Sequence, residues 1–136
     1  MVSHLPFKWS VRIYFEDTDS GGVVYHSNYL KFMERARTEW LRSLHLNQAD
    51  LKKKDKIMFV VANVNIDYKK AARFNDELDI ETSIDKIGAS RVDLTQNIMK
   101  NSDLYTSAKV SIACIHSETF KPQRIPKLIK QQMEIL

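Results

Sequence analysis

The chain has 136 residues, of which 43% are hydrophobic and 28% charged. These values fit one domain, residues 1–136, with a buried core. A net charge of +4 is too small to indicate a nucleic-acid-binding protein. The single cysteine, Cys114, excludes an internal disulfide and favours a reducing compartment. No apolar run approaches the ~20 residues of a membrane-spanning helix, and no secretory signal opens the chain, so we expect a cytoplasmic protein.

The first predicted elements are a strand, a loop and a long helix. Residues 11–16 alternate between apolar and polar side chains, which predicts a strand with one buried face. Residues 17–22 are polar and end in two glycines, as in a loop. From about Asn28 to Leu46 apolar residues recur every three or four positions, which predicts a helix. Ser27 or Asn28 is expected to cap its N-terminus.

The rest of the chain predicts strands. Alternating patterns occupy residues 60–68, 78–85, 92–98 and 108–114. Short connections at 88–90 and 100–103 suit hairpins, so we expect these four strands to form an antiparallel meander. Pro126 is expected to open a short final helix through Leu128, Ile129, Met133 and Leu136.

One strand, one long helix and four further strands predict an α+β architecture, in which an antiparallel sheet packs against one helix. A single helix covers only one side of the sheet, and two edge strands remain open. We therefore expect the domain to pair with a copy of itself, as a dimer or a tetramer.

Residues that can carry chemistry gather before the predicted helix. Asp17, Asp19 and His26 stand on a polar loop that ends at the helix N-terminus. Backbone N–H groups of the first turn lack intrahelical partners and can stabilise a carbonyl oxygen that becomes negative during acyl transfer. A nearby carboxylate can attack the acyl carbon or activate water. Thioester hydrolysis needs little more, because a thiolate is a good leaving group.

Each of these residues also has an ordinary structural explanation. An aspartate beside a glycine often forms a turn hydrogen bond, which would suffice for Asp17 and Asp19. A histidine such as His26 often caps a helix or completes a loop. Glu34 would normally pair with Lys31 or Arg37 on the helix surface.

Metal sites fit the sequence poorly. In a calcium loop that began at Asp17, the fifth position would be Gly21 and the twelfth Asn28, and neither supplies the required carboxylate. No cysteine and histidine stand at the spacing of zinc ligands. We expect neither a metal nor a redox cofactor.

The long run Glu16-Asp17-Thr18-Asp19-Ser20-Gly21-Gly22-Val23-Val24-Tyr25-His26-Ser27-Asn28-Tyr29, continued by residues 32–37, closely resembles the YbgC-like branch of the 4-hydroxybenzoyl-CoA thioesterase family. The resemblance extends through Tyr68, Asp76 and residues 125–127, so it covers nearly the whole chain. It implies a hotdog fold, in which an antiparallel sheet wraps around one long helix. It also implies dimers or tetramers with active sites at the dimer interface.

Residue by residue, the resemblance assigns catalysis to Asp19 and His26. The polarising backbone N–H of the family falls near His26, and Tyr25, Ser27 and Asn28 are expected near the oxyanion or the acyl group.

The family binds CoA phosphates at a basic turn between two later strands. Here that turn is residues 88–91, so the resemblance makes Ser90 and Arg91 candidate CoA contacts, with Lys70 as another. Lys69 and Arg73 are further candidates, and a solvated role suits each of these cations equally well.

The sequence thus predicts an acyl-CoA thioesterase that acts on short or small acyl groups and uses CoA only as part of its substrate. Two alternatives stay open. A hotdog hydratase would share the fold but would need a histidine–carboxylate pair. A partner-binding role with acyl carrier protein or the Tol–Pal envelope system, peripheral at the inner membrane, is also implied by the resemblance.

Overall fold

The computed structural model describes residues 6–135, and side chains as far as Glu134. Its strands are β1 (Phe7–Arg12), β2 (Ile57–Tyr68), β3 (Glu77–Ile87), β4 (Arg91–Lys100) and β5 (Asp103–His116). Its helices are α1 (Ser27–Ser43), α2 (Gln48–Asp50) and α3 (Lys127–Ile135), with a 3-10 turn η1 (Phe15–Asp17) and a π-helical turn η2 (Leu51–Asp55).

The strands form one antiparallel sheet in the order β1-β3-β4-β5-β2. Strands β3, β4 and β5 make the predicted hairpins. The prediction that all four later strands form one meander is wrong, because β2 pairs with β5 and not with β3. Hairpin loops have two to about five residues. Residues 69–76 make a longer connection, which carries the chain across the end of the sheet.

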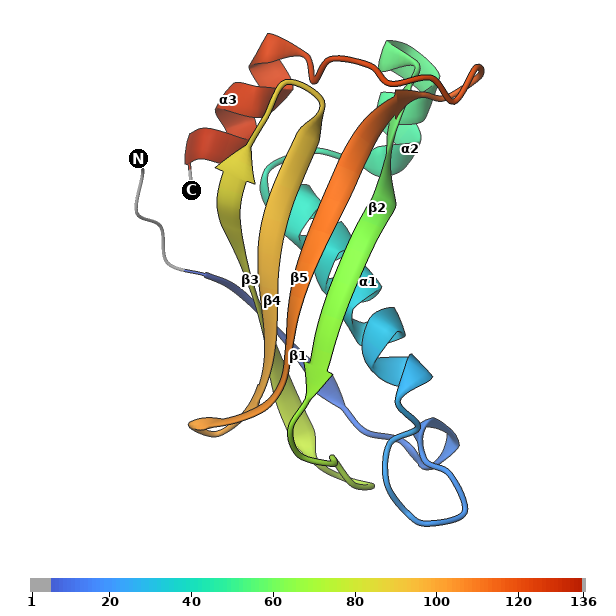
Figure 1. The fold of residues 1–136 in the computed structure, drawn as a ribbon, viewed down its shortest axis with the longest axis vertical. Coiled ribbons are helices and arrows are strands. Elements are labelled where there is room, and N and C mark those ends of the chain that lie inside the picture. The colour runs from blue at the N-terminus through green and yellow to red at the C-terminus, as the bar shows by residue number, and fades with distance from the viewer. Residues whose placement is uncertain (1–5, 136) are drawn as a thin grey trace.

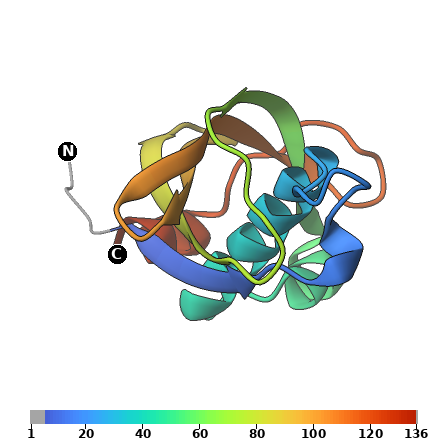
Figure 2. The same cartoon turned by 90° about the horizontal axis from the view of Figure 1, so that it is seen from below.

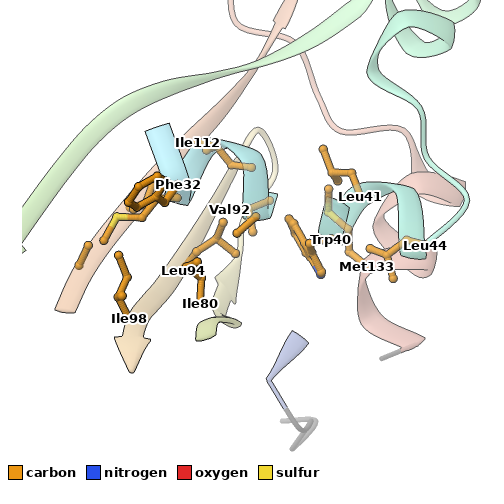
Figure 3. Packing of buried hydrophobic residues seen from close by; sticks show 14 of the residues in the cluster. Phe32, Trp40, Leu41, Leu44, Ile80, Val92, Leu94, Ile98, Ile112 and Met133 are labelled. Atoms are coloured by element: carbon orange, nitrogen blue, oxygen red, sulfur yellow. The ribbon is translucent and has the colours of Figure 1, made fainter. Parts of the chain in front are cut away.

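The sheet curves around α1, as Figures 1 and 2 show from two directions. The apolar face of α1 packs on the concave face of the sheet, where Phe32, Trp40 and Leu41 meet residues such as Leu94 and Ile112 (Figure 3). Apolar burial of this kind is the main favourable term in folding. The predicted α+β hotdog fold is therefore confirmed.

The first strand lies earlier than predicted. It covers Phe7–Arg12, and Phe7, Trp9 and Val11 pack against the core. The prediction that residues 13–16 continue this strand is wrong, because β1 ends at Arg12. Phe15, predicted to be buried, is 78% exposed, because η1 turns the chain there.

Helix α1 agrees with the prediction except at its cap. The N-cap residue is His26, and its side chain makes no capping hydrogen bond. The expectation that Ser27 or Asn28 caps the helix is wrong. The amide of Asn28 instead donates to the carbonyl oxygen of Asp17 at 2.8 Å, which ties the first turn to the preceding loop.

A polar connection joins the middle of α1 to the sheet. Arg37 donates to the side-chain oxygen of Gln96 at 2.9 Å. The amide nitrogen of Gln96 donates to the carbonyl oxygen of Met33 at 3.0 Å and to the hydroxyl of Thr82 at 2.9 Å. Gln96 is fully buried, so these bonds satisfy groups that water cannot reach. Burial lowers the pKa of Arg37, and Glu34 partly opposes that shift.

The predicted final helix is present as α3. Ile129 and Met133 are buried against the core, whereas Leu128 is 76% exposed and takes no part in that packing. Leu136 lies outside the described residues.

Candidate active site

Asp19 lies in a tight turn at one end of the molecule, in the loop between η1 and α1. Its Oδ1 accepts a hydrogen bond from the N–H of Gly21 at 2.8 Å, and its carbonyl oxygen accepts one from Gly22 at 3.0 Å. Gly22 has a φ of +79°, a conformation that favours glycine. The turn therefore fixes one oxygen of an exposed carboxylate. Its Oδ2 accepts no hydrogen bond from residues 6–135.

Asp17 has a structural place in the same loop. Its Oδ2 accepts a hydrogen bond from the N–H of Tyr14 at 2.8 Å. Its carbonyl oxygen accepts from the N–H of Tyr25 at 3.1 Å as well as from the amide of Asn28. The interpretation of Asp17 as a turn residue agrees with this geometry.

His26 is surrounded by aromatic rings at the start of α1. Its imidazole stacks on the ring of Tyr25, with 4.8 Å between the ring centres, and it meets Tyr68 edge-on at 5.8 Å. The hydroxyl of Tyr68 donates to the carbonyl oxygen of His26 at 3.3 Å. Contacts to the imidazole ring and a hydrogen bond to the backbone carbonyl oxygen thus both position His26.

The backbone at the helix start offers two donors for an oxyanion. In the described part of the chain, the N–H groups of His26 and Ser27 have no hydrogen-bond acceptor, whereas those of Asn28 and Tyr29 donate to the carbonyl oxygens of Tyr25 and His26. The positive end of the helix dipole lies at the same place. Two adjacent donors are what a developing oxyanion requires.

A cavity of about 420 Å³ opens beside His26. Its walls are Val24, His26, Tyr29, Tyr68, Lys69, Lys70 and Ala71. Tyr29 is nearly fully buried there, and its hydroxyl accepts a hydrogen bond from the N–H of Ala72 at 3.0 Å. Burial raises the pKa of both Tyr29 and Tyr68, so both phenols stay protonated at neutral pH. Tyr68 at the end of β2 and the three residues that follow it therefore form one wall of the cavity.

The predicted CoA contacts fall into two groups. Lys70 lines the cavity beside His26, and its ammonium lies 3.6 Å from the carboxylate of Asp103. Ser90 and Arg91 lie at the opposite end of the sheet, close to α3, since the N–H of Ile125 donates to the carbonyl oxygen of Ala89 (Figure 1). Strand β3 separates the two ends, and its eleven residues span about 36 Å. One chain therefore does not bring Arg91 and Asp19 together.

Two residues of this region had no predicted role. Tyr68 was placed at the end of a predicted strand and Tyr29 near the start of the predicted helix, and the resemblance includes both, but neither was assigned a role. The signal for Tyr29 was its place three residues after His26, on the same side of the helix.

The expected partners of Glu34 are also different. Thr38 donates to its Oε2 at 3.2 Å, and neither Lys31 nor Arg37 forms an ion pair with it among residues 6–135. Arg37 turns instead to the buried Gln96.

Known proteins resemble the chain over nearly its whole length. A family model described as the thioesterase-like superfamily matches residues 13–133. An acyl-CoA thioesterase YbgC from Haemophilus influenzae is 42% identical over 124 residues, which are 91% of this chain and 91% of that protein. An acyl-CoA thioester hydrolase YbgC from Escherichia coli O157:H7 is 41% identical over 124 residues, 90% of this chain and 92% of that protein.

The solved structures agree with these matches. A DHNA-CoA thioesterase from Staphylococcus aureus has a TM-score of 0.80 and 29% identity, and the match covers 86% of this chain and 78% of that one. The predicted family is confirmed by the sequence matches, and the fold by the structural one. The chain therefore belongs to the thioesterase-like superfamily, as a relative of the YbgC acyl-CoA thioesterases.

Proposed function

We propose that this protein hydrolyses acyl-CoA thioesters to a free acid and CoA, with short or small acyl groups as substrates. The observation that carries the proposal is the start of α1. There the backbone N–H groups of His26 and Ser27 have no acceptor among residues 6–135, and they follow the loop that carries Asp19. The family membership agrees with this chemistry.

In the proposed reaction, the thioester carbonyl oxygen receives hydrogen bonds from the N–H groups of His26 and Ser27. Asp19 acts either as a general base that removes a proton from water or as a nucleophile that forms an acyl anhydride. Addition makes a tetrahedral oxyanion, and its collapse breaks the C–S bond and releases CoA thiolate, which takes up a proton. When Asp19 is the nucleophile, water then attacks the acyl anhydride, which frees the acid and restores the carboxylate of Asp19. His26 orients the water or exchanges protons. No metal or redox cofactor takes part in these steps.

The direct test is a panel of acyl-CoA substrates of increasing chain length, with the released CoA followed by a thiol reagent. Turnover should be present for short or small acyl groups and should survive dialysis against EDTA. Hydrolysis that requires an added divalent ion would contradict the mechanism, and a protein that hydrolyses no thioester would contradict the function.

The same panel separates hydrolysis from the hydratase alternative. A hydratase needs a histidine paired with a carboxylate, as acid and base. Within residues 6–135 the His26 imidazole contacts the rings of Tyr25 and Tyr68 and makes no hydrogen bond to a carboxylate. Enoyl-CoA added to the protein should therefore gain no water across its double bond.

We also propose that the chain works as a homodimer or a homotetramer. Strand β2 is twelve residues long and lies at the sheet edge, and no strand among residues 6–135 pairs with its outer side. Val61, Val64 and Tyr68 on this strand are 47%, 39% and 42% exposed. A long exposed edge of this kind is a template for pairing with another strand. Sedimentation equilibrium that shows only a 15.9 kDa species would contradict the assembly.

The proposal extends to partners and location. Acyl carrier protein presents its acyl group as a thioester too, so it is proposed as a second source of substrate, and acyl-carrier-protein substrates belong in the panel. The resemblance supports a cytoplasmic position, peripheral at the inner membrane and associated with the Tol–Pal system. None of the helices among residues 6–135 has the length and hydrophobicity needed to cross a bilayer.

A further inference from the structure

Positive charge is concentrated at the end of the molecule opposite Asp19. Residues 45–56 and 116–130 contain eight Lys or Arg and only three Asp or Glu. That excess of five is larger than the excess of four for the whole chain, so the remaining residues are close to neutral. We call this surface the basic end, and its cations are Lys52, Lys53, Lys54, Lys56, Lys121, Arg124, Lys127 and Lys130.

The segments of the basic end lie side by side in space. The N–H of Ser117 donates to the carbonyl oxygen of Lys56 at 2.8 Å, which joins the loop after β5 to the end of η2. A depression between η2 and the start of α3 is lined by Lys54, Lys127 and Leu128 together. Figure 1 shows η2, this loop and α3 at one end, with the Asp19 loop at the other.

The eight cations lie at the surface and are not engaged by the three carboxylates of the same segments. None of them forms an ion pair within the described part of the chain, although seven ion pairs occur elsewhere. All are exposed except Lys130, which is partly exposed. Their charge is therefore available to an external anion.

Two large apolar side chains project from the same surface. Leu128 is 76% exposed and Phe120 is 65% exposed. Phe120 has a φ of +59°, which is unusual for a bulky residue. Its N–H donates to the carbonyl oxygen of His116 at 2.8 Å, and the His116 ring accepts from the N–H of Glu118 at 3.1 Å. A bonded turn thus holds an aromatic ring out toward solvent.

We propose that the basic end docks on an anionic lipid surface, with Phe120 and Leu128 entering the interfacial region. Seven of the eight cations are lysines, which protein–protein interfaces disfavour and which bind a diffuse negative surface as flexible point charges. Exposed apolar side chains among lysines are typical of peripheral membrane binding. This inference rests on the peripheral membrane position proposed above and names the surface that would carry it; it does not depend on the proposed hydrolysis.

The test is co-sedimentation with vesicles of phosphatidylcholine alone and of phosphatidylcholine mixed with phosphatidylglycerol. We expect binding only to the anionic vesicles, and weaker binding at high salt because screening shortens the reach of surface charges. The variant K52Q/K53Q/K54Q should bind on the order of 100-fold more weakly, since each lysine near an anionic surface contributes about fivefold in affinity. Its hydrolysis of soluble acyl-CoA should be unchanged.

Two further variants make the test specific. K8Q/K31Q/K109Q removes the same charge from other exposed positions and should bind vesicles as the unmodified protein does. Phe120→Asn removes the ring but suits a positive φ, and it should weaken vesicle binding with little change in melting temperature.

Three results would overturn the proposal. One is equal binding, or none, to the two kinds of vesicle. Another is an equal loss of binding in the two triple-lysine variants. The last is binding to an acidic protein or to duplex DNA, tested in parallel, without binding to anionic vesicles, which would assign the basic end to a different polyanion.

Discussion

The hydroxyl of Tyr68 reaches the carbonyl oxygen of His26 at 3.3 Å and so joins the end of β2 to the start of α1. In Tyr68→Phe this bond is lost while the ring contact with His26 remains. A hydrogen bond worth about 1 kcal/mol corresponds to a fall of roughly fivefold in kcat if it positions the oxyanion donors. Steady-state kinetics should show a lower kcat with little change in KM or melting temperature. Tyr14→Phe, which removes the hydroxyl of another exposed tyrosine, is the matched control.

The carboxylate of Asp19 is expected to be essential for turnover. Asn has nearly the same shape and can still accept the hydrogen bond from Gly21, so Asp19→Asn should fold normally. Because an amide is neither a general base nor a good nucleophile, kcat should fall on the order of 100-fold or more. Asp17→Asn, which can still accept from Tyr14, should cost much less activity. His26→Ala should fall between them, since it loses the imidazole but keeps the backbone N–H.

Kinetics on a short acyl-CoA, recorded with melting temperatures, separates these three variants. A well-folded Asp19→Asn protein with nearly normal turnover would remove Asp19 from the mechanism. Glu34, on the first turns of α1, would then be the next carboxylate to substitute.

The pair of Asp76 and Lys100 should make stability depend on pH. Their charged atoms are 3.0 Å apart. Burial acts to raise the pKa of Asp76, but hydrogen bonds from the Arg73 N–H and from Lys100 outweigh it and lower that pKa below its ordinary 3.8. The hydrogen bond to Asp76 raises the pKa of Lys100 above 10.5. The ion pair therefore contributes fully to the free energy of unfolding between pH 3.8 and pH 10.5, and this contribution is lost as the pH falls below 3.8.

Asp76→Asn tests this linkage. The variant should be less stable by about 1 kcal/mol at pH 7, since it loses the charge but keeps an acceptor for Arg73. The difference in the free energy of unfolding should shrink as the pH falls below 3.8 and the carboxyl of the unmodified protein takes up a proton. Urea unfolding at pH 7 and at a series of pH values below 3.8 measures it, and a difference that stays constant would contradict the assignment.

We expect that the single cysteine, Cys114, does not react with the thiol reagent that is used to follow released CoA. Cys114 is fully buried, and burial raises the pKa of its thiol to about 11. The thiolate is the reactive form, so the native protein should not react with a disulfide reagent at pH 8. Unfolding in guanidinium should release one equivalent of chromophore per chain. Rapid reaction of the native protein would show that β5 opens locally.

The separation of Arg91 from Asp19 predicts complementation between subunits. If one CoA touches both residues, then a second copy must supply Arg91. Asp19→Asn and Arg91→Gln should each be impaired alone. Mixed dimers should regain one intact site, which gives roughly a quarter of normal activity after random two-fold assembly. Mixtures no more active than their components would show that Arg91 does not serve the partner's site.

The sequence patterns predicted most of the fold because an element that buries one face carries apolar residues at regular intervals, every second residue in a strand and every third or fourth in a helix. Strands β3, β4 and β5 were found within a few residues, since each buries alternate side chains. The position of β2 was missed because pairing order depends on long-range contacts. The first strand was misplaced because the exposed Phe15 happens to continue the alternation of Trp9 and Val11.

Less of the site could be predicted from the patterns. The loop, the helix start and the candidates Asp17, Asp19 and His26 on them were located by residue type and spacing. The resemblance then singled out Asp19 and His26. The aromatic wall was not, because Tyr68 reaches His26 from a strand 42 residues away in the chain. The roles of Asp19 and His26 remain predictions that the variants above test.

The buried amide of Gln96 has a consequence for the precision of the active site. By donating to the carbonyl oxygen of Met33, it fixes the position of α1 along its own axis relative to the sheet. A helix that slipped by one turn would carry its N-terminus about 5.4 Å along its axis, away from the loop that presents the carboxylate. A buried amide in the middle of the sheet would thus set the alignment of the proposed oxyanion donors with the carboxylate of Asp19.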